Sequence, residues 1–157
     1  MIYPNNIVLE VTTKCNLICK GCALHGPSKC VDRPTGSMAQ FTWEKVIHEI
    51  GSWNRPVSVI AHGGGEPLIH PQLKQIIHDA KRYPHVTIGF LTNGMLLDES
   101  WTEYLISAGL DWISFSIDGV SPETHRQIRK NSDLKTIESN LRFLIHSKRK
   151  SGNKKRR

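Results

Sequence analysis

The 157-residue sequence contains no apolar run long enough to cross a bilayer, and it does not begin with an apolar signal segment. Cysteine is also scarce. There are four, and three of them fall within eight residues, which is too close a spacing for a disulfide framework. We therefore expect a cytoplasmic protein without membrane association. In that reducing compartment, thiols bind metals or take part in catalysis.

Acidic residues are fewer than basic ones, 14 against 21, which gives a formal net charge of +7. Seven of the basic residues lie in residues 148–157, so the rest of the chain is neutral. A nucleic-acid-binding protein usually carries basic side chains over a folded face as well, so we do not expect nucleic acid as a partner. An RNA-binding tail is a weaker alternative to a solvated helix end. We predict one domain over residues 1–147 and a basic, disordered tail over residues 148–157.

Short β-branched runs alternate with amphipathic patterns along the chain. The runs predict strands at residues 7–12, 57–61, 86–91 and 112–117. The amphipathic patterns predict helices near residues 43–50, 73–80, 101–108, 122–130 and 133–145. Strands that alternate with crossover helices in this way predict an α/β fold with a parallel sheet and right-handed connections.

Each predicted strand is followed by residues that an ordinary turn does not require. These clusters are Cys15, Cys19 and Cys22; Gly63-Gly64-Gly65-Glu66-Pro67; Thr92-Asn93-Gly94; and Ser116 with Asp118-Gly119. Ligands of α/β sheets bind at the carboxyl ends of the strands. We therefore predict that the four clusters form one site.

The cysteine spacing C-x3-C-x2-C supplies three thiolates, one fewer than a closed four-iron cluster takes from protein. One iron of such a cluster would be open to another ligand. The alternative is a structural zinc site with His25 or Cys30 as the fourth ligand. The clusters after the other three strands favour the iron–sulfur interpretation, because a zinc knuckle does not need them. We expect Cys30 to be dispensable.

The glycine run lacks the Lys-Ser/Thr ending of a P-loop and the spacing of a dinucleotide-binding fingerprint. Consecutive glycines let a backbone approach a bound molecule closely, and Glu66 can pair with a positive charge. A plain turn is the alternative for this run. Asn93-Gly94 and Asp118-Gly119 are also common turn sequences, so their value lies in their position after strands.

Together, the segments 13–22, 64–68, 91–94 and 116–119 resemble the motifs of the radical S-adenosylmethionine (radical SAM) superfamily, over residues 7–146. This resemblance implies a 4Fe-4S cluster on Cys15, Cys19 and Cys22, with S-adenosylmethionine (AdoMet) chelating the open iron. It also implies an enzyme that generates a 5′-deoxyadenosyl radical and abstracts hydrogen from a substrate. A reductant such as flavodoxin or ferredoxin would supply the electron.

The resemblance also suggests cofactor-binding residues. Gly64, Gly65 and Glu66 match the motif that accepts hydrogen bonds from the AdoMet ammonium group. Polar contacts to the ribose and methionine ends are implied for Thr92, Asn93, Ser116 and Asp118. Arg129 is a candidate to bind the methionine carboxylate, and Arg126 competes with it for this role.

Two features depart from the family pattern. Gly21 stands where many relatives have an aromatic residue beside the adenine. The chain has four βα units where related cores have about six, so we expect a partial (β/α) barrel, truncated before strands five and six, with an exposed strand edge. A separate carboxyl-terminal piece is a candidate partner.

The motifs are similar to those of enzymes with a SPASM or twitch extension and of the molybdopterin-precursor enzyme, which suggests a peptide or small-molecule substrate. A non-catalytic accessory protein that binds zinc or an iron–sulfur cluster is the alternative function.

Overall fold

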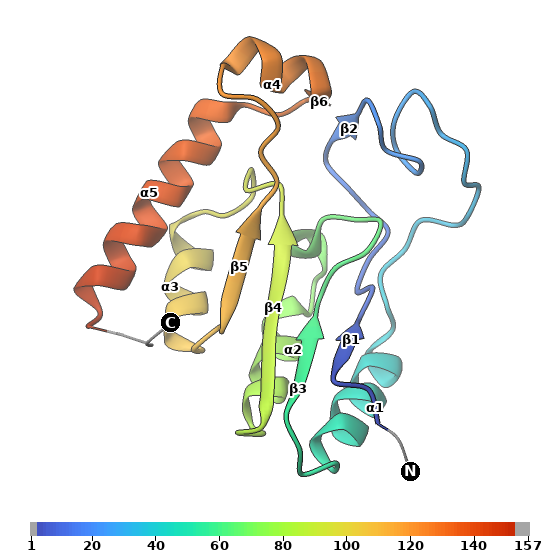
Figure 1. The fold of residues 1–157 in the computed structure, drawn as a ribbon, viewed down its shortest axis with the longest axis vertical. Helices are drawn as coiled ribbons and strands as arrows, with labels where there is room; N and C mark the ends of the chain where they lie inside the picture. The colour runs from blue at the N-terminus through green and yellow to red at the C-terminus, as the bar shows by residue number, and fades with distance from the viewer. Residues whose placement is uncertain (1–2, 153–157) are drawn as a thin grey trace.

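The computed structural model describes residues 3–152 (Figure 1). Its elements, in chain order, are β1 (Asn6–Val8), β2 (Ile18–Cys19), α1 (Gln40–Gly51), β3 (Val57–Ile60), the 3₁₀ helix η1 (Pro67–Ile69), α2 (Leu73–Lys81), β4 (Val86–Thr92), α3 (Glu99–Ser107), β5 (Trp112–Phe115), α4 (Pro122–Ile128), β6 (Arg129–Lys130) and α5 (Leu134–Lys150).

Four strands form the main sheet in the order β1-β3-β4-β5, and every neighbouring pair is parallel. The predicted α/β class and the parallel sheet are therefore confirmed. Because all four strands run in the same direction, their carboxyl ends lie at one edge, at the top of Figure 1. The loops that follow the strands meet there.

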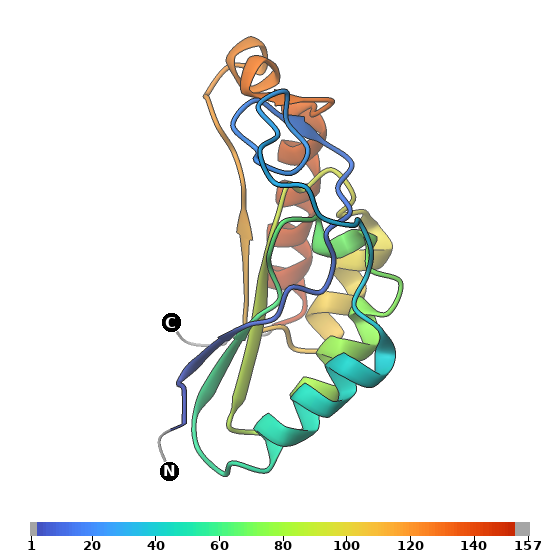
Figure 2. The same cartoon turned by 90° about the vertical axis from the view of Figure 1, so that its right-hand side faces the viewer.

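The helices α1, α2, α3 and α5 lie on one side of the sheet (Figure 2). Alternate strand residues point toward them, including Val59, Ile88 and Phe90, which are fully buried against helix residues such as Trp43 and Ile76. The opposite face of the sheet carries no helix within residues 3–152. The sheet is therefore the wall of an open, partial barrel.

The predicted helix starts are confirmed at two caps. The Ser121 side chain accepts a hydrogen bond from the Thr124 amide at 3.2 Å, and Asp133 accepts one from the Thr136 amide at 3.1 Å. Gly109 follows α3 with a φ of 69°, a conformation that glycine adopts without strain. Local capping chemistry therefore fixes the helix boundaries that the sequence indicated.

The predicted strand at residues 7–12 is divided between two partners. Residues 6–8 pair with β3, and the last hydrogen bond of that pairing runs from the Leu9 amide to the Ile60 carbonyl at 2.9 Å. Val11 then accepts from the Met38 amide at 2.7 Å, and Thr12 bridges to Ser37. The β-branched run correctly indicated extended backbone, but such a pattern does not identify the partner strand.

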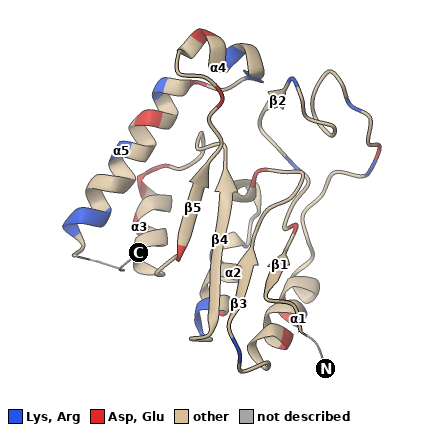
Figure 3. Ribbon diagram, in the orientation of Figure 1, with Lys and Arg blue, Asp and Glu red and all other residues tan. Residues whose placement is uncertain are grey.

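The carboxyl-terminal third differs from the prediction in two places. The helix expected over residues 122–130 ends at Ile128, because Arg129 and Lys130 form β6 and pair with β2. The helix α5 continues to Lys150 and so includes the first residues of the predicted tail. Basic side chains in a last helical turn interact favourably with the helix dipole, and they appear blue at that end of α5 in Figure 3. The remainder of the predicted tail, residues 153–157, lies outside the described residues.

Within the described residues, no helix combines the length and the apolar character that a bilayer span requires.

We predict that Gly89→Ala destabilises the sheet. Gly89 lies opposite Trp112 in the β4–β5 pair, and a Cβ at position 89 would overlap both the Trp112 indole and its carbonyl oxygen. Overpacking of this kind costs about 1–3 kcal/mol of unfolding free energy. Urea denaturation of the variant measures this loss.

Gly36→Ala is the matched control, because no heavy atom lies within 4 Å of a Cβ built at that position. Equal denaturation midpoints for the two variants would show that the Gly89–Trp112 contact does not limit the packing of the sheet.

Candidate cofactor site

A cavity of about 440 Å³ lies at the carboxyl edge of the sheet. Its size is within the range of small-molecule and cofactor sites. Every residue predicted for the site lines it, namely Cys15, Cys19, Cys22, Gly64, Gly65, Glu66, Thr92, Asn93, Ser116, Asp118 and Arg129. The four strand-end clusters therefore converge on one cavity.

The cysteine loop is folded by its own backbone hydrogen bonds. The Cys22 amide donates to the Cys19 carbonyl, and the Gly26 amide donates to the Cys22 carbonyl, each at 3.0 Å. Two further amides point at sulfur atoms, those of Leu17 to Cys15 Sγ at 3.5 Å and of His25 to Cys22 Sγ at 3.3 Å. Such donors stabilise negative charge on sulfur, which suits thiolate ligands.

Burial raises the pKa of the Cys15 and Cys19 thiols. The Leu17 amide partly offsets this effect at Cys15, and the positive charge of Arg129 partly offsets it at Cys19. The free thiols are therefore favoured over thiolates at neutral pH. Coordination to a metal would reverse this balance, because a bound cation deprotonates a ligating thiol.

The geometry does not assemble the zinc site that was the alternative interpretation. Within residues 3–152, no three Cys, His, Asp or Glu side chains converge closely enough for one metal ion, whose ligand distances are about 2.0–2.3 Å. His25 donates from Nε2 to the Thr13 carbonyl at 2.7 Å, and Cys30 is exposed and does not line the cavity. Cys15, Cys19 and Cys22 line the cavity together, and His25 is the only other thiol or imidazole of the zinc alternative that lines it.

Glu66 is 2% exposed and connects two strand ends. Its Oε1 accepts hydrogen bonds from the Leu68 amide at 3.2 Å and the Thr92 hydroxyl at 2.7 Å, and its Oε2 accepts one from the Asn93 amide at 2.8 Å. Burial raises the pKa of the Glu66 carboxyl, and the three donors oppose that shift. A cation bound in the cavity would further stabilise the carboxylate.

The glycines pack closely against the chain itself. A Cβ on Gly64 would overlap the Leu24 side chain, and one on Gly65 would lie 2.5 Å from the carbonyl oxygens of Thr12 and Lys14. The loop after β3 is therefore pressed against the cysteine loop and the end of the first strand. The sequence interpretation considered close approach to a ligand or a plain turn, whereas close packing against the protein's own chain also favours glycine here.

Sequence reasoning missed the role of Glu10 at this edge. Its Oε1 accepts from the Gly64 amide at 2.6 Å, and its two oxygens bind the Arg33 guanidinium at 2.5 and 2.9 Å. The Arg33 guanidinium holds the pKa of the Glu10 carboxyl below its usual range. The bidentate pair fastens the long loop after the cysteines to the glycine run. An isolated Glu after a strand gives no sequence signal for this contact.

Two other polar residues at this edge of the sheet were also missed. Asn16 accepts a hydrogen bond from the Asn93 side-chain amide at 2.8 Å, which ties the cysteine loop to the end of β4. His62 lines the cavity, and its buried Nδ1 has no hydrogen-bond partner among the described residues. Burial lowers the pKa of His62, so its neutral form is favoured. The scattered histidines of the sequence gave no spacing from which to select His62.

Arg129 contacts the cysteine loop directly. Its Nε donates to Asp118 Oδ2 at 2.6 Å, and its Nη1 lies 3.8 Å from Cys19 Sγ. Arg126, the competing candidate, is exposed on α4 and does not line the cavity. The structure thus places Arg129, and not Arg126, beside the cysteines.

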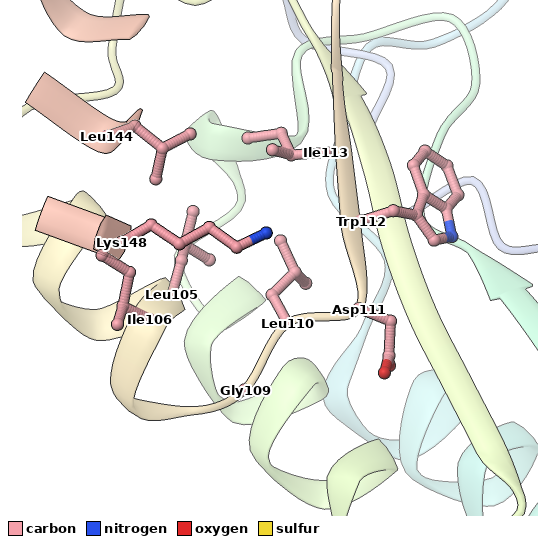
Figure 4. A pocket seen from close by; sticks show the side chains of 9 residues that line it. All are labelled: Leu105, Ile106, Gly109, Leu110, Asp111, Trp112, Ile113, Leu144 and Lys148. Carbon is pink, nitrogen blue, oxygen red and sulfur yellow. The ribbon is translucent and has the colours of Figure 1, made fainter. Parts of the chain in front are cut away.

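A second cavity, of about 310 Å³, lies between α3, β5 and α5 near the start of β5 (Figure 4). Apolar side chains such as Leu105, Ile113 and Leu144 line it, and the Lys148 amine points into it. None of the predicted site residues contributes to this cavity. Its lining offers no set of groups for metal or cofactor chemistry, so the candidate site remains at the carboxyl edge.

We predict that Glu66→Gln destabilises the protein even without any ligand. The introduced amide nitrogen would face one of the three donors that now bind the carboxylate, and an unsatisfied buried group costs about 1–3 kcal/mol. Glu103→Gln on the exposed surface of α3 is the control. Chemical denaturation of both variants tests this, and equal stability would contradict the structural role of the carboxylate.

Comparison with known proteins identifies a family and several relatives. The Radical SAM superfamily model matches residues 9–152. The AdoMet-dependent heme synthase of Methanosarcina barkeri is 33% identical over 129 residues, which is 80% of this chain and 34% of that protein. The GTP 3′,8-cyclase of Chlorobaculum tepidum is 31% identical over 140 residues, 87% of this chain and 40% of that protein. The chain thus spans less than half the length of these curated relatives.

Solved structures share the fold. A structure of anSMEcpe with bound AdoMet has a TM-score of 0.78 at 22% identity, covering 92% of this chain and 42% of that one. A structure of Streptococcus suis SuiB bound to its precursor peptide SuiA has a TM-score of 0.69 at 16% identity, covering 92% of this chain and 31% of that one. The family match covers most of the sequence and includes all the residues that line the cavity. The chain belongs to the radical SAM superfamily.

Proposed function

We propose that this chain carries the cluster-binding and AdoMet-binding part of a radical SAM enzyme, with a 4Fe-4S cluster on Cys15, Cys19 and Cys22. The observation that carries the proposal is the convergence of the three cysteines with the ends of β3, β4 and β5 on one cavity. Superfamily membership supports an iron–sulfur cluster and AdoMet as the cofactors. When bound, the pair would supply a 5′-deoxyadenosyl radical that abstracts hydrogen from the substrate.

The donor set fits the cluster. The three cysteines line the cavity together, and backbone amides donate to two of the three sulfurs. The fourth cysteine of the chain, Cys30, is exposed in the following loop. Three ligands leave the fourth iron of a cubane cluster for a non-protein ligand.

The groups beside the cysteines suit the methionine end of AdoMet, which carries both charges of an amino acid. Glu66 and the backbone carbonyls at Gly64 and Gly65 would accept hydrogen bonds from its ammonium group. Thr92 and Asn93 would orient Glu66 toward this end of AdoMet, because they donate hydrogen bonds to the two oxygens of the Glu66 carboxylate. Ser116 and Asp118, which also line the cavity, would provide further polar contacts.

Two further components complete the proposal. The reaction requires a one-electron reductant, for which flavodoxin and ferredoxin are candidates. Related proteins include a heme synthase and a GTP 3′,8-cyclase, and the SuiB structure contains a precursor peptide. A small molecule and a peptide are therefore both candidate substrates of the whole protein.

We expect Cys15→Ala, Cys19→Ala and Cys22→Ala each to lose most of the bound iron after anaerobic reconstitution. Each variant removes one of only three protein ligands, so the cluster loses a required bond. Iron and sulfide analysis with visible absorption measures the loss. Cys30→Ala is the matched control and should keep wild-type iron content. Loss of the cluster in Cys30→Ala as complete as in Cys15→Ala would contradict the three-ligand site.

We expect AdoMet to perturb the electron paramagnetic resonance spectrum of the reduced cluster, with weak binding and slow cleavage to 5′-deoxyadenosine. The binding groups for the methionine end are present, but one face of the sheet is uncovered within residues 3–152. Water in an open site shortens the life of reactive intermediates.

Dithionite-driven cleavage assays measure this activity. Rapid multiple turnover by a monomer would contradict the expectation of slow cleavage and would show that four βα units suffice. A cluster that neither responds to AdoMet nor cleaves it would instead favour the non-catalytic accessory function.

A further inference from the structure

The pair formed by β2 and β6 places one arginine directly opposite one of the cysteines. In this antiparallel ladder, Cys19 is the partner of Arg129, and Ile18 is the partner of Lys130. The Lys20 amide extends the pairing by donating to the Ile128 carbonyl at 2.8 Å. Side chains of directly opposed residues project from the same face, and the next pair projects from the other. Arg129 therefore shares a face with Cys19, and Lys130 does not.

Two contacts fix the orientation of the Arg129 guanidinium. Its Nε donates to Asp118 Oδ2 at 2.6 Å, and its Nη1 lies 3.8 Å from Cys19 Sγ, within reach of an N–H···S hydrogen bond. The Arg129 side chain is 20% exposed and the Asp118 side chain 44% exposed, so the guanidinium is partly shielded from water. A guanidinium anchored through one nitrogen presents its other N–H groups in a fixed direction.

We propose that Arg129 raises the reduction potential of the cluster by donating an N–H hydrogen bond to the Cys19 sulfur, with Asp118 as the residue that positions it. This inference rests on the cluster of the proposed function. One-electron reduction by an external low-potential donor adds negative charge to the cluster and its sulfur ligands. Hydrogen bonds to those sulfurs stabilise the reduced form and so raise the potential.

This role differs from the one that the family resemblance implied for Arg129. If Arg129 bound the methionine carboxylate, it would affect the cluster only when AdoMet is present. The contact with Cys19 Sγ involves protein atoms alone, so its effect on the cluster does not require AdoMet. The potential measured without AdoMet therefore separates the two roles.

The test compares R129Q, R129K and the wild-type chain, each reconstituted with its cluster and without AdoMet. A redox titration followed by electron paramagnetic resonance gives the midpoint potential. We expect R129Q to shift to a more negative potential. R129K keeps the positive charge but loses the guanidinium, which donates to both Asp118 and Cys19, so its potential should lie between those of R129Q and the wild type.

K130Q is the matched control, because it removes the same charge from the neighbouring residue of β6 on the opposite face. Its potential should equal that of the wild type. If R129Q fails to hold a cluster, the comparison of R129K with the wild type decides the question.

The inference would be overturned if both Arg129 variants had the wild-type potential. If R129Q holds no cluster, a wild-type potential in R129K would overturn it. An Arg129 variant that keeps the wild-type potential and only binds AdoMet more weakly would also overturn it. That result would show that Arg129 binds the methionine carboxylate. An equal shift in K130Q would also overturn it, because the effect would then be a general one of charge. If the wild-type chain binds no iron, the proposed function itself fails, which is a separate result.

Discussion

Parallel pairing of β1, β3, β4 and β5 is the constraint on which the site depends. It brings the four carboxyl ends to one edge, so segments more than 90 residues apart in the sequence line one cavity. Buried polar contacts then fix that edge. Glu66 joins η1 to the end of β4, and Glu10 joins the glycine run to Arg33. The cavity is therefore held by the same groups that shape it.

The charges of the cavity are arranged unevenly. The Glu66 carboxylate lies deep beside the end of β4, and the Arg129 guanidinium lies against Cys19 on the side of β6. Burial disfavours the charged forms of Glu66, Cys15 and Cys19. Such a site is stabilised by an occupant that brings positive charge to both the carboxylate and the thiols. A cationic amino acid end and an iron cluster satisfy these two requirements.

Most of the sheet and the location of the site could be predicted from the sequence. Strands β3, β4 and β5 follow from β-branched runs, and the motif residues follow from their position after each run. The pairing of β2 with β6 could not be predicted, because two-residue strands have no periodicity. The Glu10–Arg33 pair also left no pattern, since it joins residues 23 apart through a loop of irregular conformation. Both missed contacts are long-range: the β2–β6 pair positions the cysteine loop, and the Glu10–Arg33 pair positions the loop that follows it.

Mössbauer spectroscopy of the chain reconstituted with ⁵⁷Fe tests the central claim most directly, because it distinguishes irons that differ in their ligands. In a four-iron cluster with three cysteine ligands, one iron lacks a cysteine ligand, and under the proposed function AdoMet would bind there. The account predicts a four-iron cluster in which the signal of one iron shifts when AdoMet is added. Four irons that remain equivalent with AdoMet, a two-iron cluster, or a chain that takes up zinc in place of iron would contradict it.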